Sequence, residues 1–308
     1  MKIASVTFFD PSREIGGGSV PAQSFKEWCD LLWVNCEVVS CPLNANQLNS
    51  NYDAIFFNTP PRKEFDWQNL KIPFAIMIHD ETDLYKYATF TEMVAHPLCR
   101  TLIHIDHDGH FYNRFHSNNV IWHPCCSPRN LIYPSNPAKS KSQILYAARI
   151  VEWKNAHLLK NFSKEFNQDA TIIGRIDDHA YAQKNKIISF GFDSTPYEGC
   201  DVFWDLCGSK TNHMTVHRMN LAAFEAISNG LMPIINPKAI PQGIQDIFIE
   251  ANPLSFSGDQ LNADLYIYRA NKEHYWSLMY EKLSRSYASF KQVQYRVVEI
   301  IEHLWRRK

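Results

Sequence analysis

Short apolar runs alternate with amphipathic segments along the chain. In the first half, apolar runs of strand length lie at residues 2–9, 36–41, 52–60, 73–80, 100–106 and 119–125. Residues 21–34 instead carry apolar side chains at helical spacing. Strands that are apolar on both faces are typical of a parallel sheet with helices packed on either side. We therefore predict an α/β fold for this half.

A second alternating set follows a polar, proline-bearing stretch at residues 133–142, which is typical of a linker. Its predicted strands are residues 143–149, 169–174, 186–192, 200–207 and 231–236, and its predicted helices are residues 155–166 and 219–230. We expect Rossmann-like domains at residues 1–137 and 138–285, and a C-terminal helix at residues 286–308 that crosses back to the first domain. Ligands of such folds bind at the carboxyl ends of the strands, so we expect a cleft there.

Composition adds limits to this picture. The chain has 308 residues, more than one hydrophobic core usually holds. Its formal net charge of −1 gives no overall basic surface, although a local patch is compatible with that value. No apolar run reaches membrane-spanning length, and we expect a soluble, cytoplasmic protein. The eight cysteines form no CxxC pair, which favours free thiols.

Charged residues stand where a ligand of this fold would bind. Arg149 ends the strand 143–149, and Lys154 lies near the start of the next helix. Two cations beside a helix N-terminus suit a diphosphate, although each alone also looks like an ordinary surface residue. Glu225 lies beside the apolar stripe of the helix 219–230, where a carboxylate needs a partner. Vicinal ribose hydroxyls would serve, and so would a nearby basic side chain.

These segments carry a resemblance. Residues 147–155, AARIVEWKN, resemble the G-R-x-x-x-x-K-G element of retaining glycosyltransferases of the GT-B fold. Residues 222–235, AAFEAISNGLMPII, resemble the E-A-x-x-x-G-x-P-V-I element of that family. The resemblance implies two Rossmann-like domains, a nucleotide-sugar co-substrate such as UDP-glucose, and no cofactor or metal ion. It also implies that Arg149 and Lys154 hold the donor diphosphate and that Glu225 binds the ribose.

The sequence departs from the family pattern at several positions. Ala148 and Asn155 replace the two glycines of the first element. His217 stands where the family has its first glutamate, which contacts the donor sugar, and Arg218 and Asn220 could share that contact.

Two further donor-side positions come from less specific signals. Gly17 and Gly18 belong to a GGG stretch after the first strand, which resembles the family's glycine loop near the donor phosphates. Such a stretch is also compatible with a flexible loop. Phe190, in the strand predicted at residues 186–192, either contacts the nucleobase or packs in the core.

His79 and Asp80 end the strand predicted at residues 73–80. A carboxylate beside an imidazole suits a general base, and an aspartate before a helix also suits an N-cap. With the W-K pair and the missing glutamate, this pair resembles the α-glucosyltransferases of T-even bacteriophages, which add sugar to hydroxymethylated cytosines in DNA. The resemblance implies that Asp80 is the base, that His79 assists, and that double-stranded DNA with modified bases is a partner.

Other functions remain open at this point. The acceptor could be a saccharide or a surface glycan, and the lost glutamate is also compatible with an inactive nucleotide-sugar-binding protein. The stretch 104–116 is rich in histidine and aspartate, but its spacing does not match the usual metal-hydrolase motifs. We predict no metal there and place His107 and His110 on the acceptor side.

Overall fold

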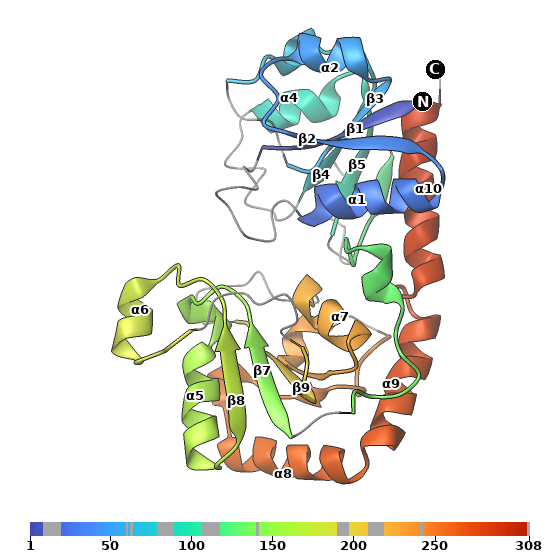
Figure 1. The fold of residues 1–308 in the computed structure, drawn as a ribbon. Helices are drawn as coiled ribbons and strands as arrows, with labels where there is room; N and C mark the ends of the chain where they lie inside the picture. Colours follow the sequence, from blue (N-terminus) through green and yellow to red (C-terminus); the bar gives the residue numbers. More distant parts are fainter. Residues whose placement is uncertain are drawn as a thin grey trace. The chain divides into compact units, whose positions relative to one another are not determined.

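The structure, a computed structural model, describes residues 1–8, 20–59, 61, 64–78, 89–105, 118–139, 142–189, 197–208, 219–240 and 243–306. The chain divides into two compact units (Figure 1). Unit 1 comprises Met1–Pro128 and Tyr287–Lys308, and unit 2 comprises Arg129–Ser286. The end of the chain therefore belongs to the same unit as its beginning.

Unit 1 is built on a parallel sheet. Within the described residues its strands are β1 (Lys2–Thr7), β2 (Asn35–Ser40), β3 (Ala54–Phe57), β4 (Phe74–Ile78), β5 (Cys99–His104) and β6 (Asn119–Ile121). They lie in the order β2-β1-β3-β4-β5-β6. The helices are α1 (Val20–Leu31), α2 (Ala45–Asn51), α4 (Thr89–Ala95) and α10 (Phe290–Trp305), and η1 (Trp67–Asn69) is a 3-10 turn. A further 3-10 turn, η3 (Pro128–Leu131), begins at the last residue of this part of unit 1 and continues into unit 2.

Alternation along the strands of unit 1 sends apolar side chains to both faces of the sheet. Phe57 packs in one cluster with Leu48 of α2 and Met93 of α4. On the other face, Phe25 of α1 stacks on Phe56 of β3, with ring centroids 4.3 Å apart. The helices α1 and α10 contact each other, and α10 also contacts β3 to β6. Both faces are therefore covered, as a parallel sheet requires.

Unit 2 contains a second parallel sheet. Within the described residues its strands are β7 (Gln143–Ala147), β8 (Asp169–Ile173), β9 (Val202–Asp205), β10 (Met232–Ile235) and β11 (Ile249–Glu250), in the order β11-β10-β9-β7-β8. The helices are α5 (Ala156–Glu165), α6 (His179–Lys184), α7 (Leu221–Ser228), α8 (Gly258–Ala270) and α9 (Lys272–Arg285). The 3-10 turns are η4 (Glu152–Lys154), η5 (Pro237–Ala239) and η6 (Pro253–Ser255).

Helices also cover both faces of the sheet in unit 2. Ala226 of α7 packs with Leu145 and Phe203 in one cluster. On the other face, the ring of Phe162 in α5 lies 6.2 Å from that of Trp204. Because the strands are parallel, the carboxyl ends of β7, β8 and β9 share one edge of the sheet.

The two parallel sheets with flanking helices confirm the predicted α/β class, but the described part of one predicted strand, residues 186–189, does not form a strand. Residues 187–189, in the segment predicted as a strand at 186–192, are irregular, and Lys186 has a left-handed φ of 50°. The sheet instead includes β11, whose two residues are too few to show a period of two. All eight cysteines are described, and none of them is joined in a disulfide.

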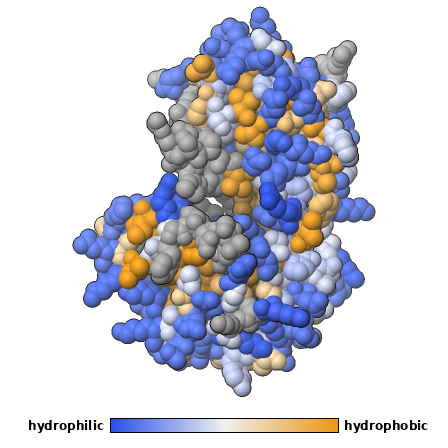
Figure 2. Space-filling model, in the orientation of Figure 1, coloured by the Kyte–Doolittle hydropathy of each residue, from blue (hydrophilic) through white to orange (hydrophobic). Residues whose placement is uncertain are grey.

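The viewed surface is mostly hydrophilic, with hydrophobic patches scattered among polar side chains (Figure 2). Among the helices of the described residues, none is both long and apolar enough to span a bilayer.

Candidate functional site

Charged side chains gather at the carboxyl edge of the unit 2 sheet. Arg149 follows β7, Arg175 follows β8, and Asp205 ends β9. Lys154 ends η4, one short turn after Arg149. The hydroxyl of Tyr146 donates to the Arg149 carbonyl at 2.8 Å. Burial raises the pKa of this phenol; the charge of Asp205 acts in the same direction, and that of Arg149 opposes it.

Arg149 takes part in an ion-pair cluster that the sequence did not reveal. Its Nη1 lies 3.5 Å from Oδ2 of Asp177. Arg175 holds the same carboxylate more closely, with Nε 2.5 Å from Oδ1. The pKa of Asp177 is held below its usual value, mainly by Arg175 and to a lesser extent by Arg149. The Arg149 side chain is nevertheless 47% exposed, which leaves it able to reach a ligand.

Lys154 is positioned by the turn that contains it. Its Nζ lies 5.0 Å from the ring centroid of Trp153, a cation–π contact. The next residue, Asn155, has a left-handed backbone with φ 56°. Its buried side-chain amide donates to the carbonyls of Leu206 at 2.9 Å and Gly208 at 2.8 Å. Asn155 thus adopts a left-handed conformation, which asparagine tolerates better than most residues other than glycine. Unlike glycine, it also donates hydrogen bonds to the loop after β9.

Asp205 is a buried carboxylate that the sequence analysis missed. Its residue is 6% exposed, and its Oδ1 accepts hydrogen bonds from Asn220 Nδ2 at 2.6 Å and Cys207 Sγ at 3.2 Å. Burial raises the pKa of Asp205, and the Lys154 charge is the largest influence that opposes this rise. An acidic residue inside the apolar run 202–206 was the available signal.

Asn220 is the N-cap residue of α7, but its side chain does not cap that helix. Its amide instead donates to Asp205 and to the sulfur of Cys207, the latter at 2.9 Å. The amide is therefore used inside the protein. The first N–H groups of α7 consequently have no side-chain cap from this residue.

Glu225 lies on α7, as the helical periodicity predicted. It neighbours the phenol of Tyr197, whose pKa is raised first by burial and then by the Glu225 charge. Gly230 follows the helix with a left-handed φ of 84°, the conformation in which a glycine commonly ends a helix. A Cβ at Gly230 would lie 2.6 Å from the backbone nitrogen of Ala138, so the close approach requires glycine.

Several predicted site residues lie outside the described residues. They are Gly17, Gly18, His79, Asp80, His107, His110, Phe190, His217 and Arg218. Of the histidine-rich stretch, His104 is described, and it is buried at the end of β5. In the part of the chain that the structure describes, no three His, Cys, Asp or Glu side chains are grouped to hold a metal ion.

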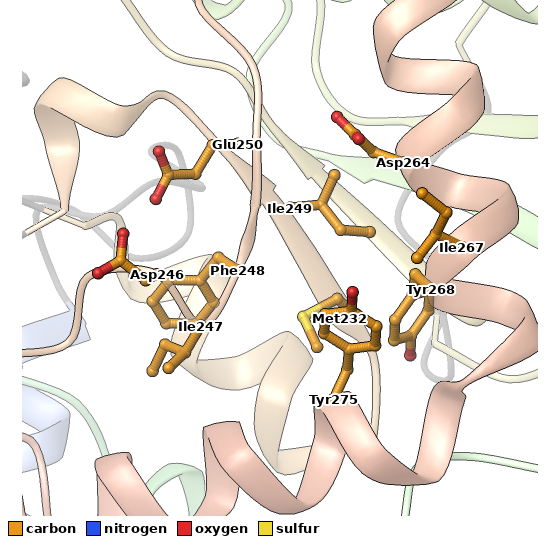
Figure 3. A pocket seen from close by; sticks show the side chains of 10 residues that line it. All are labelled: Met232, Asp246, Ile247, Phe248, Ile249, Glu250, Asp264, Ile267, Tyr268 and Tyr275. Carbon is orange, nitrogen blue, oxygen red and sulfur yellow. The ribbon is translucent and has the colours of Figure 1, made fainter.

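A cavity of about 300 Å³ lies in unit 2, and its lining contains none of Arg149, Lys154, Asp205 and Glu225. Its lining is mainly apolar and aromatic and consists of Met232, Asp246, Ile247, Phe248, Ile249, Glu250, Asp264, Ile267, Tyr268 and Tyr275. Figure 3 shows the carboxylates of Asp246 and Glu250 on one side and that of Asp264 on the other. None of the described residues that the sequence analysis assigned to a site lines this cavity.

No protein-family model matches this sequence, and no curated protein matches it. Solved structures do. An alpha-glucosyltransferase in complex with UDP-glucose and DNA containing an abasic site has a TM-score of 0.68 and 13% identity, over 99% of this chain and 98% of that one. AviGT4, a glycosyltransferase involved in Avilamycin A biosynthesis, has a TM-score of 0.65 and 10% identity, over 99% and 98%. HepE of Anabaena in complex with UDP-glucose has a TM-score of 0.64 and 13% identity, over 98% and 99%.

These similarities span nearly the whole of each chain at low sequence identity, so they establish the fold. Together with the two parallel sheets, they confirm the predicted fold class. The chain has the α/β fold of GT-B glycosyltransferase structures.

Proposed function

We propose that this protein is a glycosyltransferase that moves a sugar from a nucleotide-sugar donor to an acceptor hydroxyl, with retention at the anomeric carbon. The observation that carries the proposal is the pair of cations, Arg149 and Lys154, at the carboxyl edge of a sheet with this fold. That edge is where ligands of open α/β sheets bind. Solved structures with the same fold contain UDP-glucose.

In this proposal the donor lies on unit 2. Arg149 and Lys154 bind the diphosphate, and the first N–H groups of α7 add favourable partial charge. Glu225 accepts hydrogen bonds from the vicinal ribose hydroxyls, beside the Tyr197 phenol. We assign Asn220 to holding the start of α7, because its amide is bound to Asp205.

The remaining donor-side assignments rest on the sequence. Gly17 and Gly18 allow backbone approach to the phosphates, His217 and Arg218 contact the donor sugar, and Phe190 contacts the nucleobase. UDP-glucose is the donor we favour, and no resident cofactor is needed.

The chemistry follows from charge. The bond between the anomeric carbon and the donor's phosphate oxygen breaks, and the carbon bonds to the acceptor oxygen on the same face of the sugar. The nucleoside diphosphate leaves with negative charge, which fixed cations at the edge of the sheet stabilise without reorganisation. The acceptor proton passes to Asp80, which His79 assists.

For the acceptor, we propose a hydroxymethylated base in double-stranded DNA, such as a bacteriophage carries. One structure with this fold is described in complex with DNA and UDP-glucose. A base would have to leave the stack to reach a buried site. His107 and His110 would then lie on the acceptor side.

Calorimetry with UDP and UDP-glucose tests the donor site. Arg149→Ala and Lys154→Ala should each weaken UDP binding by about 1.5–3 kcal/mol, the magnitude of hydrogen bonds to charged groups. Lys164→Ala is the matched control, because this exposed lysine lies in the last turn of α5, away from the carboxyl edge. Unchanged UDP affinity in both site variants would remove these cations from the donor site.

Transfer of labelled sugar to hydroxymethylated and unmodified DNA tests the acceptor. We expect product only on hydroxymethylated DNA, DNA affinity that falls steeply with salt as counterions are released, and a large loss of turnover in Asp80→Asn. Transfer to a saccharide instead would redirect the proposal to a glycan acceptor. UDP-glucose binding without any transfer would support an inactive nucleotide-sugar-binding protein.

A further inference from the structure

The segments after β7 and β8 continue side by side beyond the two strands. Ile150 and Ile176 form an isolated parallel bridge. The backbone N–H of Ile150 donates to the Arg175 carbonyl at 2.8 Å, and the N–H of Asp177 donates back to the Ile150 carbonyl at 3.3 Å. Ile150 is fully buried, which anchors this arrangement. The backbone therefore sets Arg149 and Arg175 close to one carboxylate, Asp177.

The two arginines share that carboxylate unequally. Arg175 binds it through two nitrogens, Nε to Oδ1 at 2.5 Å and Nη2 to Oδ2 at 3.2 Å. Arg149 reaches Oδ2 through Nη1 alone, at 3.5 Å. The hydrogen bond from Arg175 is also the main reason that the pKa of Asp177 is lowered. The carboxylate is thus occupied mainly by Arg175.

This arrangement matters because a carboxylate and a phosphate compete for the same guanidinium. Both offer two oxygens in the geometry that an arginine binds bidentately. Without Arg175, the Asp177 carboxylate would have both oxygens available to Arg149. A bidentate Arg149–Asp177 pair would then oppose diphosphate binding.

We propose that Arg175 is a positioning residue for donor binding: by occupying Asp177, it keeps Arg149 available for the donor diphosphate. The inference rests on the proposed function, in which Arg149 binds that diphosphate. Arg175 acts through Asp177 and need not touch the donor. The charge it carries adds a weaker, long-range attraction for the same anion.

A double-mutant cycle separates these two contributions. The variants are Arg175→Met, Asp177→Asn and the double variant in the full-length chain, and the measurement is UDP affinity by calorimetry. We expect Arg175→Met to weaken UDP binding about ten-fold or more, as for the loss of one charged hydrogen bond. Asp177→Asn should change affinity only a few-fold in the wild type, yet restore most of it in the Arg175→Met background. Methionine keeps the apolar stem of the arginine, and thermal melting of each variant checks the fold.

The outcomes distinguish this inference from the proposed function. If Arg149→Ala weakens UDP binding but Asp177→Asn has the same effect in both backgrounds, Arg175 acts only as a charge and this inference is overturned. If Arg175→Met leaves UDP affinity unchanged, the inference is overturned as well. If the wild type does not bind UDP, or if Arg149→Ala leaves UDP affinity unchanged, both the inference and the donor role of Arg149 are overturned.

Discussion

At the scale of single residues, Asn155 shows how a departure from a motif can be compensated. Its left-handed backbone suits glycine, but its amide donates to the carbonyls of Leu206 and Gly208. Asn155→Gly should therefore cost about 2–4 kcal/mol of unfolding free energy, because buried carbonyls lose their donors. Asn155→Ala should cost about 1–2 kcal/mol more, since alanine resists the left-handed region. Urea denaturation measures both, and equal stability of Asn155→Gly and the wild type would contradict this account.

Gly174 is required by the close approach of two strand ends. A Cβ at this position would lie 1.8 Å from the carbonyl oxygen of Ala148, the residue before Arg149. Gly174→Ala should destabilise the protein by at least about 2 kcal/mol and also weaken UDP binding, because the clash displaces the segment that carries Arg149. Gly243→Ala is the matched control, since its φ is also positive, at 90°, but no atom lies within 4 Å of the added Cβ. Thermal melting and calorimetry of both variants check this prediction.

The sequence could indicate some site residues and not others. Arg149 and Lys154 could be identified as candidates from the sequence, because Arg149 ends a predicted strand and Lys154 lies near the start of a predicted helix. The sequence did not indicate Asp205, because its role depends on a hydrogen bond from a residue 15 positions away in the chain. Asn220 Nδ2 donates to Asp205 Oδ1 at 2.6 Å. The sequence did not indicate Asp177 either, since its ion pair with Arg149 depends on the backbone bridge between Ile150 and Ile176. Tertiary pairing of this kind leaves no periodic signal in a sequence.

At the scale of elements, periodicity predicted strands and helices where burial is strong. The runs that became β1, β3, β4 and β7 are buried over most of their length, and α7 has the expected apolar stripe. The segment 186–192 has a similar apolar run but no strand in its described part. A strand needs a neighbour to pair with, and a short apolar run alone does not show whether one exists.

An ion pair attaches α8 to the start of β9. Arg269 of α8 donates through Nε to Asp201 Oδ2 at 2.9 Å and through Nη2 to Oδ1 at 3.2 Å. The Asp201 side chain is 3% exposed, so Arg269→Ala leaves a buried carboxylate without its cation and should cost about 3–5 kcal/mol. The control is Arg285→Ala, which breaks an exposed pair with Glu281 and should cost less than about 1 kcal/mol. Similar losses in the two variants, measured by urea denaturation, would contradict a buried structural role for Arg269.

At the scale of the whole molecule, the alternation of apolar runs and amphipathic segments was sufficient to predict the α/β class, because each sheet must bury two faces. The chain order adds a consequence, since α10 belongs to unit 1 although it follows all of unit 2. Four of its side chains, Val293, Val297, Ile300 and Leu304, are buried. Each contributes about 1.5–3 kcal/mol on burial, so together they rival the whole stability of a typical domain.

A chain that ends at Ser286 should therefore lose the fold of unit 1 and keep that of unit 2. Unit 2 retains both faces of its sheet and every described residue that we assign to the donor. In scanning calorimetry we expect the full chain to show a transition that UDP shifts upward, by mass action on the folded state, and a second transition that UDP shifts much less, since Gly17 and Gly18 are the unit 1 residues that we assign to the donor. Truncation should abolish the second transition and preserve the first with its UDP shift. Loss of both transitions would show that unit 2 depends on unit 1 for its stability. If UDP shifts only the transition that truncation removes, the donor binds unit 1 and its assignment to unit 2 is contradicted.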